Sequence, residues 1–267
     1  MSALIYQVDA FTDRPFAGNP AGVCILPSPR PAEWYQQVAA EMNLAETAFL
    51  VPAQSGWNLR WFTPTVEVDL CGHGTLAAAH VLYETGALPE DRPVEFYTRS
   101  GALSAAKVGS AIELDFPSEP ASVPAGETLS SALCAALGVS PRKALRNRLD
   151  VLLELDSDAA VRDLDPDFGA LAQVDTRGLI VTARAAEGRD YDFVSRFFAP
   201  AAGILEDPVT GSAHCALAPY WSAKLGRDRL VGYQASRRGG YVRVKLAGDR
   251  VRLLGRAVTV FRAEWFA

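Results

Sequence analysis

Hydrophobic and polar residues alternate along several short runs of the chain, and this pattern predicts β-strands. The clearest runs are Asn58–Phe62, Val94–Thr98, Ala111–Phe116, Gly178–Ala185, Tyr241–Leu246 and Val251–Arg262. Successive strand residues point to opposite faces of a sheet, so the alternation is typical of strands with one buried face. The stretches Ala32–Met42 and Thr128–Gly138 predict helices that flank these strands.

Two further helices are predicted to be buried on every side. The runs Thr75–Tyr83 and Ala213–Trp221 are apolar nearly all round, and each follows a turn that contains glycine. A helix of this kind needs a packing partner on all its faces. Strands that enclose each helix would provide these partners. The pattern therefore predicts an α+β fold in which antiparallel, barrel-like sheets surround buried central helices.

The second half of the chain repeats the first. At a spacing of about 137 residues, Arg60–Pro64 matches Arg196–Pro200, Gly74 matches Gly211, and the strand-turn-strand run Phe96–Val108 matches Gly232–Leu246. The duplicated unit of about 135 residues is too long for a solenoid repeat. The proline-rich stretch 117–124 marks the seam. We expect two pseudo-symmetric lobes, 1–117 and 118–256, with a cleft between them and the last strand (about 257–267) joined to the first lobe.

Composition and charge narrow the classes of function. The chain has 267 residues, of which 49% are hydrophobic, so it can bury a full core. A net charge of −5 argues against nucleic-acid or anionic-membrane partners, which need a basic surface. Asp9 and Asp13 interrupt the N-terminal stretch where a signal peptide would be apolar, and four scattered cysteines predict no disulfide framework. We expect a cytoplasmic protein with no membrane span.

The two glycine-flanked helix beginnings are candidates for binding an anion. A helix N-terminus has unpaired backbone N–H groups and a partial positive charge. Gly72, Gly74 and Gly211 allow a ligand to approach the backbone closely, and His73 and Ser212 add polar groups. Well-placed donors stabilise developing negative charge by about 3 kcal/mol each. The pair predicts a clamp for a small carboxylate substrate, with no cofactor required.

Two carboxylates, Glu46 and Asp207, are predicted to lie near these helix beginnings. They do not occupy equivalent positions in the two halves of the repeat. Glu46 comes just before an apolar strand, and the matching strand of the second half has Gly178 there. Asp207 lies four residues before Gly211, and Pro208 restricts the chain after it. Asp207 also has the position of a turn or helix-cap residue. The arrangement predicts an asymmetric acid/base site on a symmetric frame.

Four motifs together resemble the PhzF-like family of phenazine-biosynthesis isomerases, within the diaminopimelate-epimerase-like fold. They are DAFTDRPFAGNPAGV (9–23), NLAETAFL (43–50), CGHGTLAAAHVL (71–82) and EDPVTGSAHCALAPYW (206–221). The resemblance implies that Glu46 is the proton-transferring acid/base, that Asp207 faces the substrate, and that His73 and Ser212 lie at the two central-helix beginnings. It also implies cofactor-free isomerisation of a small cyclic acid, a dihydro-hydroxyanthranilate, by a homodimer. Asn19 in the first motif is a further candidate for lining the cleft.

Cys71 keeps two other functions open. Phenazine-forming members of the family carry a small residue there, whereas related amino-acid racemases and epimerases use a cysteine before the glycine as a base. Their second cysteine is replaced here by Thr210, which disfavours a two-cysteine racemase but leaves a one-cysteine epimerase open. A thiol at a helix N-terminus is expected to have a lowered pKa. The third alternative is a non-catalytic protein of the same fold that binds a metabolite or a protein partner.

We expect no metal site from the cysteine and histidine spacings. Cys71, His73, His214 and Cys215 form two short groups, with one residue between the first pair and none between the second. Zinc sites assembled from cysteine and histidine ordinarily have longer spacings within each pair of ligands. These four residues therefore do not match an ordinary zinc-binding pattern.

Overall fold

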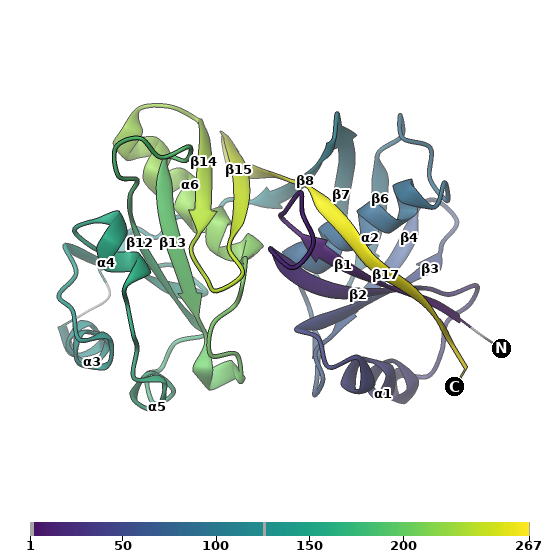
Figure 1. Ribbon diagram of the computed structural model, residues 1–267, viewed down its shortest axis with the longest axis horizontal. Helices are drawn as coiled ribbons and strands as arrows, with labels where there is room; N and C mark the ends of the chain where they lie inside the picture. The colour runs from purple at the N-terminus through teal and green to yellow at the C-terminus, as the bar shows by residue number, and fades with distance from the viewer. Residues whose placement is uncertain (1–2, 125–126, 267) are drawn as a thin grey trace. The chain divides into compact units, whose positions relative to one another are not determined.

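The computed structural model describes residues 3–124 and 127–266. The chain divides into two compact units (Figure 1): unit 1 comprises residues 1–116 and 252–267, and unit 2 comprises residues 117–251. Both units consist mainly of β-strands with a few helices, so the fold is a mixed arrangement of α and β elements.

Unit 1 contains the N-terminal strands and the last strand of the chain. Its strands are β1 (Ala3–Ala10), β2 (Asn19–Ile25), β3 (Glu46–Pro52), β4 (Trp57–Phe62), β5 (Glu67–Val68), β6 (Val94–Thr98), β7 (Gly101–Val108), β8 (Ala111–Pro117) and β17 (Ala257–Trp265), and its helices are α1 (Ala32–Met42) and α2 (Gly72–Glu84). Hydrogen bonds connect the strands in the order β17–β1–β2–β3–β4–β6–β7–β8, and β5 also pairs with β4. Figure 1 shows β17, in yellow, running along β1, in purple.

Unit 2 has a comparable set of strands. These are β9 (Val123–Pro124), β10 (Lys143–Arg146), β11 (Asp150–Glu154), β12 (Gly178–Arg184), β13 (Phe193–Phe198), β14 (Arg229–Gln234) and β15 (Gly240–Ala247), and the boundary with unit 1 falls within β16 (Arg250–Gly255). The helical segments are α3 (Glu127–Leu137), α4 (Asp158–Arg162), α5 (Phe168–Leu171), η1 (Pro200–Ala202) and α6 (Gly211–Leu225). Hydrogen bonds connect the strands in the order β9–β10–β11–β12–β13–β14–β15.

The two units share one pairing scheme, as the repeat predicts. From β1 to β7 the successive pairs β1–β2, β2–β3, β3–β4, β4–β6 and β6–β7 are alternately antiparallel and parallel. From β10 to β15 the pairs follow the same alternation. The expectation of antiparallel sheets is therefore wrong, because the strand pairing within each unit is mixed.

The helices explain the parallel pairs. A parallel pair needs a crossover connection, which is usually helical. Helix α1 lies between β2 and β3 in the chain, α2 between β4 and β6, α4 and α5 between β11 and β12, and α6 between β13 and β14. Alternating hydrophobicity indicates which strand face is buried, but it does not indicate strand direction.

The sequence placed most elements well but mismatched one pair of repeat positions. Helix α1 and strand β6 have the predicted bounds, and the last predicted run is two strands, β16 and β17. Helix α2 begins at Gly72 and α6 at Gly211, so Gly72, rather than Gly74, is the counterpart of Gly211. Cys71 and Thr210 are consequently equivalent, because each is the N-cap of its helix.

Both glycine-led helices are buried, as the sequence predicts. Helix α2 contacts β1, β2, β3, β7 and β17. These strands come from both ends of the strand order of unit 1, with β17 at one end and β7 near the other. Helix α6 contacts β14 and β15, and its residues 213–218 are all buried. Packing on several sides fixes where each helix begins, and thereby fixes the side chains at its first turn. Among the described residues, no helix combines the length and hydropathy needed to cross a bilayer.

Candidate active site

The first turn of α2 is closed by the Cys71 side chain. The backbone N–H of Gly74 donates a hydrogen bond to Sγ of Cys71 over 3.3 Å, and Oγ1 of Thr75 donates to the Cys71 carbonyl over 2.6 Å. A Cβ atom on residue 74 would lie 2.9 Å from both Sγ of Cys71 and Cδ1 of Trp61, so this position needs glycine. The turn thus fixes the thiol and the adjacent His73.

Three predicted site residues meet at this turn. Oε2 of Glu46, the first residue of β3, lies 3.0 Å from Nε2 of His73, and the two side chains are 12% and 5% exposed. The other ring nitrogen, Nδ1, lies 3.1 Å from Nδ2 of Asn19, the first residue of β2. Oε2 of Glu46 accepts no hydrogen bond of normal geometry from the described residues, so its contact with His73 is an ion pair by distance. The structure therefore brings Asn19, Glu46 and His73 together within unit 1.

Electrostatics at this turn favour a charged imidazole and a neutral thiol. Burial raises the pKa of Cys71 and the nearby Glu46 carboxylate raises it further, which together outweigh the lowering by His73. For His73, burial lowers the pKa, but negative charge at Cys71 and Glu46 raises it well above the usual 6.5. The expected lowering of the Cys71 pKa is wrong, since burial outweighs the effect of the helix N-terminus.

The geometry of this turn provides the components of acid/base catalysis. A carboxylate that is largely removed from water and within hydrogen-bond reach of an imidazole can accept a proton and return it. Gly72, the first residue of α2, is only half-buried, so the backbone at this helix beginning is accessible to a ligand.

The first turn of α6 in unit 2 is held by a different set of side chains. Oγ1 of Thr210 donates to Oδ2 of Asp207 over 2.5 Å. The Gln234 amide accepts from the Thr210 N–H over 2.8 Å and donates to the Asp207 carbonyl over 2.7 Å. All three side chains belong to buried residues. Asp207 thus stabilises the turn that leads into α6, whereas the N-cap of the helix is Thr210.

Ser212 has a cationic neighbour that the sequence analysis missed. Arg177 donates from its NH2 group to Oγ of Ser212 over 3.1 Å. Its Nε and NH2 groups also donate to the two carboxylate oxygens of Asp150 over 2.9 and 2.6 Å. The Asp150 side chain is buried, whereas that of Arg177 is 44% exposed. Asp150 therefore holds the guanidinium of Arg177 beside the first turn of α6. The only sequence signal for Arg177 was its place just before Gly178.

The internal repeat shows how the two helix beginnings differ in charge. Glu46 is paired with Ala21 across β3 and β2, and Gly178 is paired with Asp150 across β12 and β11. A Cβ atom on Gly178 would lie 2.2 Å from Cζ of Phe197, so unit 2 has no room for a glutamate there. Unit 1 consequently has an anionic side chain, Glu46, near the beginning of α2, whereas unit 2 has the Asp150–Arg177 ion pair near the beginning of α6.

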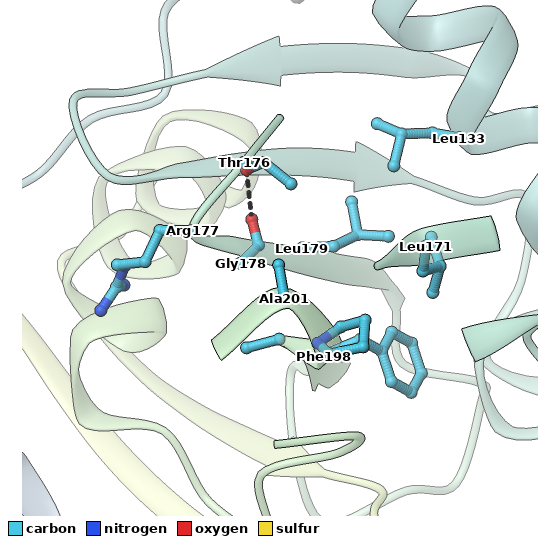
Figure 2. Close-up of a pocket in the computed structure, with 10 residues that line it drawn as sticks. Leu133, Leu171, Thr176, Arg177, Gly178, Leu179, Phe198 and Ala201 are labelled. Atoms are coloured by element: carbon cyan, nitrogen blue, oxygen red, sulfur yellow. Dashed lines mark hydrogen bonds between the residues drawn. The ribbon is translucent and has the colours of Figure 1, made fainter. Parts of the chain in front are cut away.

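A small pocket in unit 2 contains none of the predicted acid/base residues. Its lining is mostly apolar and comprises Leu133, Leu171, Thr176, Arg177, Gly178, Leu179, Phe198, Ala199, Pro200 and Ala201. Figure 2 shows the Arg177 side chain directed away from the apolar lining residues, while Oγ1 of Thr176 donates to the Gly178 carbonyl over 3.0 Å. The pocket lacks convergent polar groups, so the candidate chemistry lies at the helix beginnings instead.

Among the remaining cysteine and histidine candidates, Cys215 and His214 are core residues, and His80 is partly buried. Cys215 is buried inside α6, and burial raises its pKa to about 12. His214 is buried with Nδ1 2.8 Å from the Thr210 carbonyl, and burial lowers its pKa to about 4. Nε2 of His80 lies 3.1 Å from Oγ1 of Thr259. Thr210, the N-cap of α6, is the counterpart of Cys71 and carries no thiol.

Comparison with known proteins gives a consistent assignment over both units. The family model described as "Phenazine biosynthesis-like protein" matches residues 8–263, a range that includes all four sequence motifs. A relative from Halalkalibacterium halodurans, named an uncharacterized isomerase, is 54% identical over 265 residues, covering 99% of this chain and 98% of the relative. A second uncharacterized isomerase, from Pseudomonas aeruginosa, is 50% identical over 261 residues, covering 97% of each chain. The crystal structure of a PhzF-family phenazine biosynthesis protein from Enterococcus faecalis has 40% identity and a TM-score of 0.94, with 100% of both chains covered.

Proposed function

Because the chain belongs to the family of phenazine biosynthesis-like proteins, we propose that it is an isomerase that moves a proton and a double bond within a small carboxylic acid. Glu46 is the acid/base. The observation that carries this proposal is the 3.0 Å contact between Oε2 of Glu46 and Nε2 of His73, with the glutamate side chain only 12% exposed. The names of the two bacterial relatives, both isomerases, support the class of reaction.

In the proposed reaction Glu46 removes a proton from a carbon that a neighbouring carboxyl or conjugated system makes acidic. The electron pair left on the substrate shifts the double bond, and Glu46 returns the proton to another carbon on the same face. The reaction is balanced without an oxidant or a second substrate, and no cofactor takes part. His73 stabilises the charge on Glu46 before the first transfer and after the second, and the N–H groups at the beginning of α2 stabilise the substrate anion formed in between.

The beginning of α6 in unit 2 is an anion-binding group of its own in this proposal. Ser212 and Arg177, which are hydrogen-bonded to each other, bind a carboxylate there. Gly211 allows close approach there, and Asp207 positions the turn through Thr210. A planar guanidinium is well suited to a carboxylate because it offers several donors in one plane.

The proposed shape of each lobe and the proposed oligomeric state rest on the resemblance to the same family. We propose that the sheet of each unit curls around its buried helix, α2 or α6, as a barrel-like lobe. The lobes correspond to 1–117 with about 257–267, and to 118–256. A cytoplasmic homodimer is the proposed form of the protein.

A second candidate is a one-cysteine amino-acid epimerase. It is favoured by the position of Cys71, whose Sγ lies 3.6 Å from Nδ1 of His73 and within 4.8 Å of a Glu46 carboxylate oxygen. An epimerase needs two proton-transferring groups, one on each face of the stereocentre, and Cys71 with Glu46 is a candidate pair. The raised pKa of Cys71, caused by burial, disfavours the thiolate that this reaction requires.

The test follows deuterium uptake from heavy water into small cyclic carboxylic acids, starting with a dihydro-hydroxyanthranilate. The wild-type protein is expected to incorporate deuterium, and Glu46→Gln to slow incorporation by about 10²-fold or more. Glu41→Gln, at an exposed position at the end of α1, is the matched control and should behave as wild type. Equal rates for wild type and Glu46→Gln would end the assignment of the base. A loss in Cys71→Ser as deep as that in Glu46→Gln would favour the epimerase.

A further inference from the structure

Glu46, Cys71 and His73 form a compact cluster of three different metal-ligating side chains, which we call the triad. One ligand atom from each lies within 4.8 Å of the others. Nε2 of His73 is 3.0 Å from Oε2 of Glu46 and 3.8 Å from Sγ of Cys71. In a tetrahedral zinc site with ordinary bond lengths, neighbouring ligand atoms are about 3.3 to 3.7 Å apart. The two separations from Nε2 are close to these values, and the Glu46 oxygen and Sγ of Cys71, which lie within 4.8 Å, would move closer together to surround one ion.

The chemistry of the three ligands selects zinc over the commoner hard cations. Zinc is bound by cysteine sulfur, histidine nitrogen and carboxylate oxygen, whereas magnesium and calcium take oxygen ligands. A thiolate and a carboxylate together neutralise the two positive charges of the ion. Burial of the complex in this largely enclosed turn therefore adds no net charge to the interior.

The groups around the triad also fit a zinc site. The Gly74 N–H already donates to Sγ of Cys71, which supports a thiolate there. The Asn19 amide lies 3.1 Å from Nδ1 of His73 and leaves Nε2 directed to Glu46. An Asn amide can present oxygen or nitrogen to a neighbour. With its oxygen towards His73, Asn19 accepts the Nδ1 hydrogen and orients Nε2 for the metal, as outer-shell partners of zinc-bound histidines do.

We propose that the triad binds one Zn²⁺ ion, and that this ion inhibits the protein. On binding, the Cys71 thiol proton and the Nε2 proton of His73 pass to solvent. The sulfur of Cys71, Nε2 of His73 and Oε2 of Glu46 then each form a bond to the metal. The Oε2 lone pair that would accept a substrate proton is then used by zinc. The inhibition rests on the proposed role of Glu46, whereas the binding does not. The spacings of cysteine and histidine along the sequence do not reveal this set, because the third ligand, Glu46, lies on strand β3, far in sequence from Cys71 and His73 at the beginning of α2.

The test measures zinc binding directly. Metal-free protein is dialysed against Zn²⁺ and its zinc content is determined by mass spectrometry. Wild type is expected to retain one equivalent, and Cys71→Ser and His73→Gln to bind about tenfold more weakly or worse. Cys134→Ser and His80→Gln change a cysteine and a histidine outside the triad and should retain one equivalent. Cobalt(II) provides a spectroscopic check, because a cobalt–thiolate band should appear in wild type and be absent from Cys71→Ser.

Serine preserves an N-cap acceptor at residue 71, so thermal melting of Cys71→Ser should show a folded protein. Retention of no zinc by wild type, or equal retention by wild type and Cys71→Ser, would overturn the site. Its failure is distinguishable from that of the proposed function. Zinc binding together with full deuterium uptake in Glu46→Gln would remove only the catalytic role, and Glu46-dependent uptake without zinc binding would remove only the metal site.

Discussion

At the scale of single residues, the charge of His73 is controlled by its neighbours. Its ring is almost fully buried, and burial alone would favour the neutral form. Negative charge at Cys71 and at Glu46, whose Oε2 lies 3.0 Å from Nε2, reverses that preference. A buried imidazole that remains protonated in this way links the stability of unit 1 to pH.

The free energy of unfolding should therefore contain a contribution from His73 that falls as pH rises. The folded-state pKa of His73 is raised above its unfolded value of about 6.5, so protonated His73 stabilises the folded state fully below that pH. The stabilisation is lost as pH rises through the folded-state pKa. Urea denaturation of wild type and His73→Gln between about pH 6 and about pH 9 should show a stability gap that narrows with increasing pH. A gap of constant size would contradict the ion pair.

His214 should have the opposite effect in unit 2. Burial lowers its folded-state pKa to about 4, whereas the unfolded chain takes up a proton near pH 6.5. The stabilisation is present above pH 6.5 and is lost as pH falls towards 4, which amounts to about 3 kcal/mol. Wild type should lose this much more stability than His214→Gln over the same interval, measured by urea denaturation. Parallel declines in the two proteins would show that His214 is not held neutral.

Sequence reasoning found the residues of unit 1 and missed the ion pair of unit 2 for a physical reason. Glu46 and His73 are recognisable because each lies in a short motif at the beginning of an element. Arg177 and Asp150 meet only through the parallel register of β11 and β12, in which Asp150 is opposite Gly178. Nothing in either local segment predicts that register. Contacts that depend on strand pairing are not evident from local patterns.

At the scale of elements, the hydrophobic pattern gave boundaries but not directions. The bounds of α1 and β6 match because an amphipathic helix and a half-buried strand each have their own periodicity. The same pattern suits a parallel or an antiparallel neighbour, so the mixed sheets were not foreseen. The equivalence of Gly72 and Gly211 also became clear only from the helix beginnings, since glycines recur at nearby spacings.

The contact between β12 and β13 should tolerate no side chain at Gly178. A Cβ atom there would lie 2.2 Å from Cζ and 2.7 Å from Cε2 of Phe197. Because these are atoms of a buried aromatic ring, Gly178→Ala should reduce the free energy of unfolding by about 1 to 3 kcal/mol. Phe197→Leu removes the clashing ring atoms, so the double variant should be less destabilised than the sum of the two single changes. Strict additivity in chemical denaturation would show that the two residues do not compete for space.

At the scale of the whole molecule, unit 1 is assembled from two separate segments of the chain. Strand β17 pairs with β1 along its length, from Ala3 opposite Trp265 to Ala10 opposite Ala257. Ala263 and Trp265 also pack against a buried cluster that includes Tyr35 and Phe49. Unit 2, in contrast, is one continuous segment with a core of its own. The two units should therefore respond differently to a change at the C-terminus.

Truncation after Arg256 tests this difference. The shortened chain lacks β17, so β1 loses one of its two strand neighbours and the Tyr35 cluster loses part of its cover. Hydrogen exchange followed by mass spectrometry should show much faster exchange in β1 and β2, while β11, β12 and β13 keep their protection because their partners are all retained. Truncation after Trp265, which keeps β17, is the control and should leave both units protected. Equal loss of protection in the two units would mean that they unfold as one cooperative structure. In that case stability could not be assigned to each unit separately.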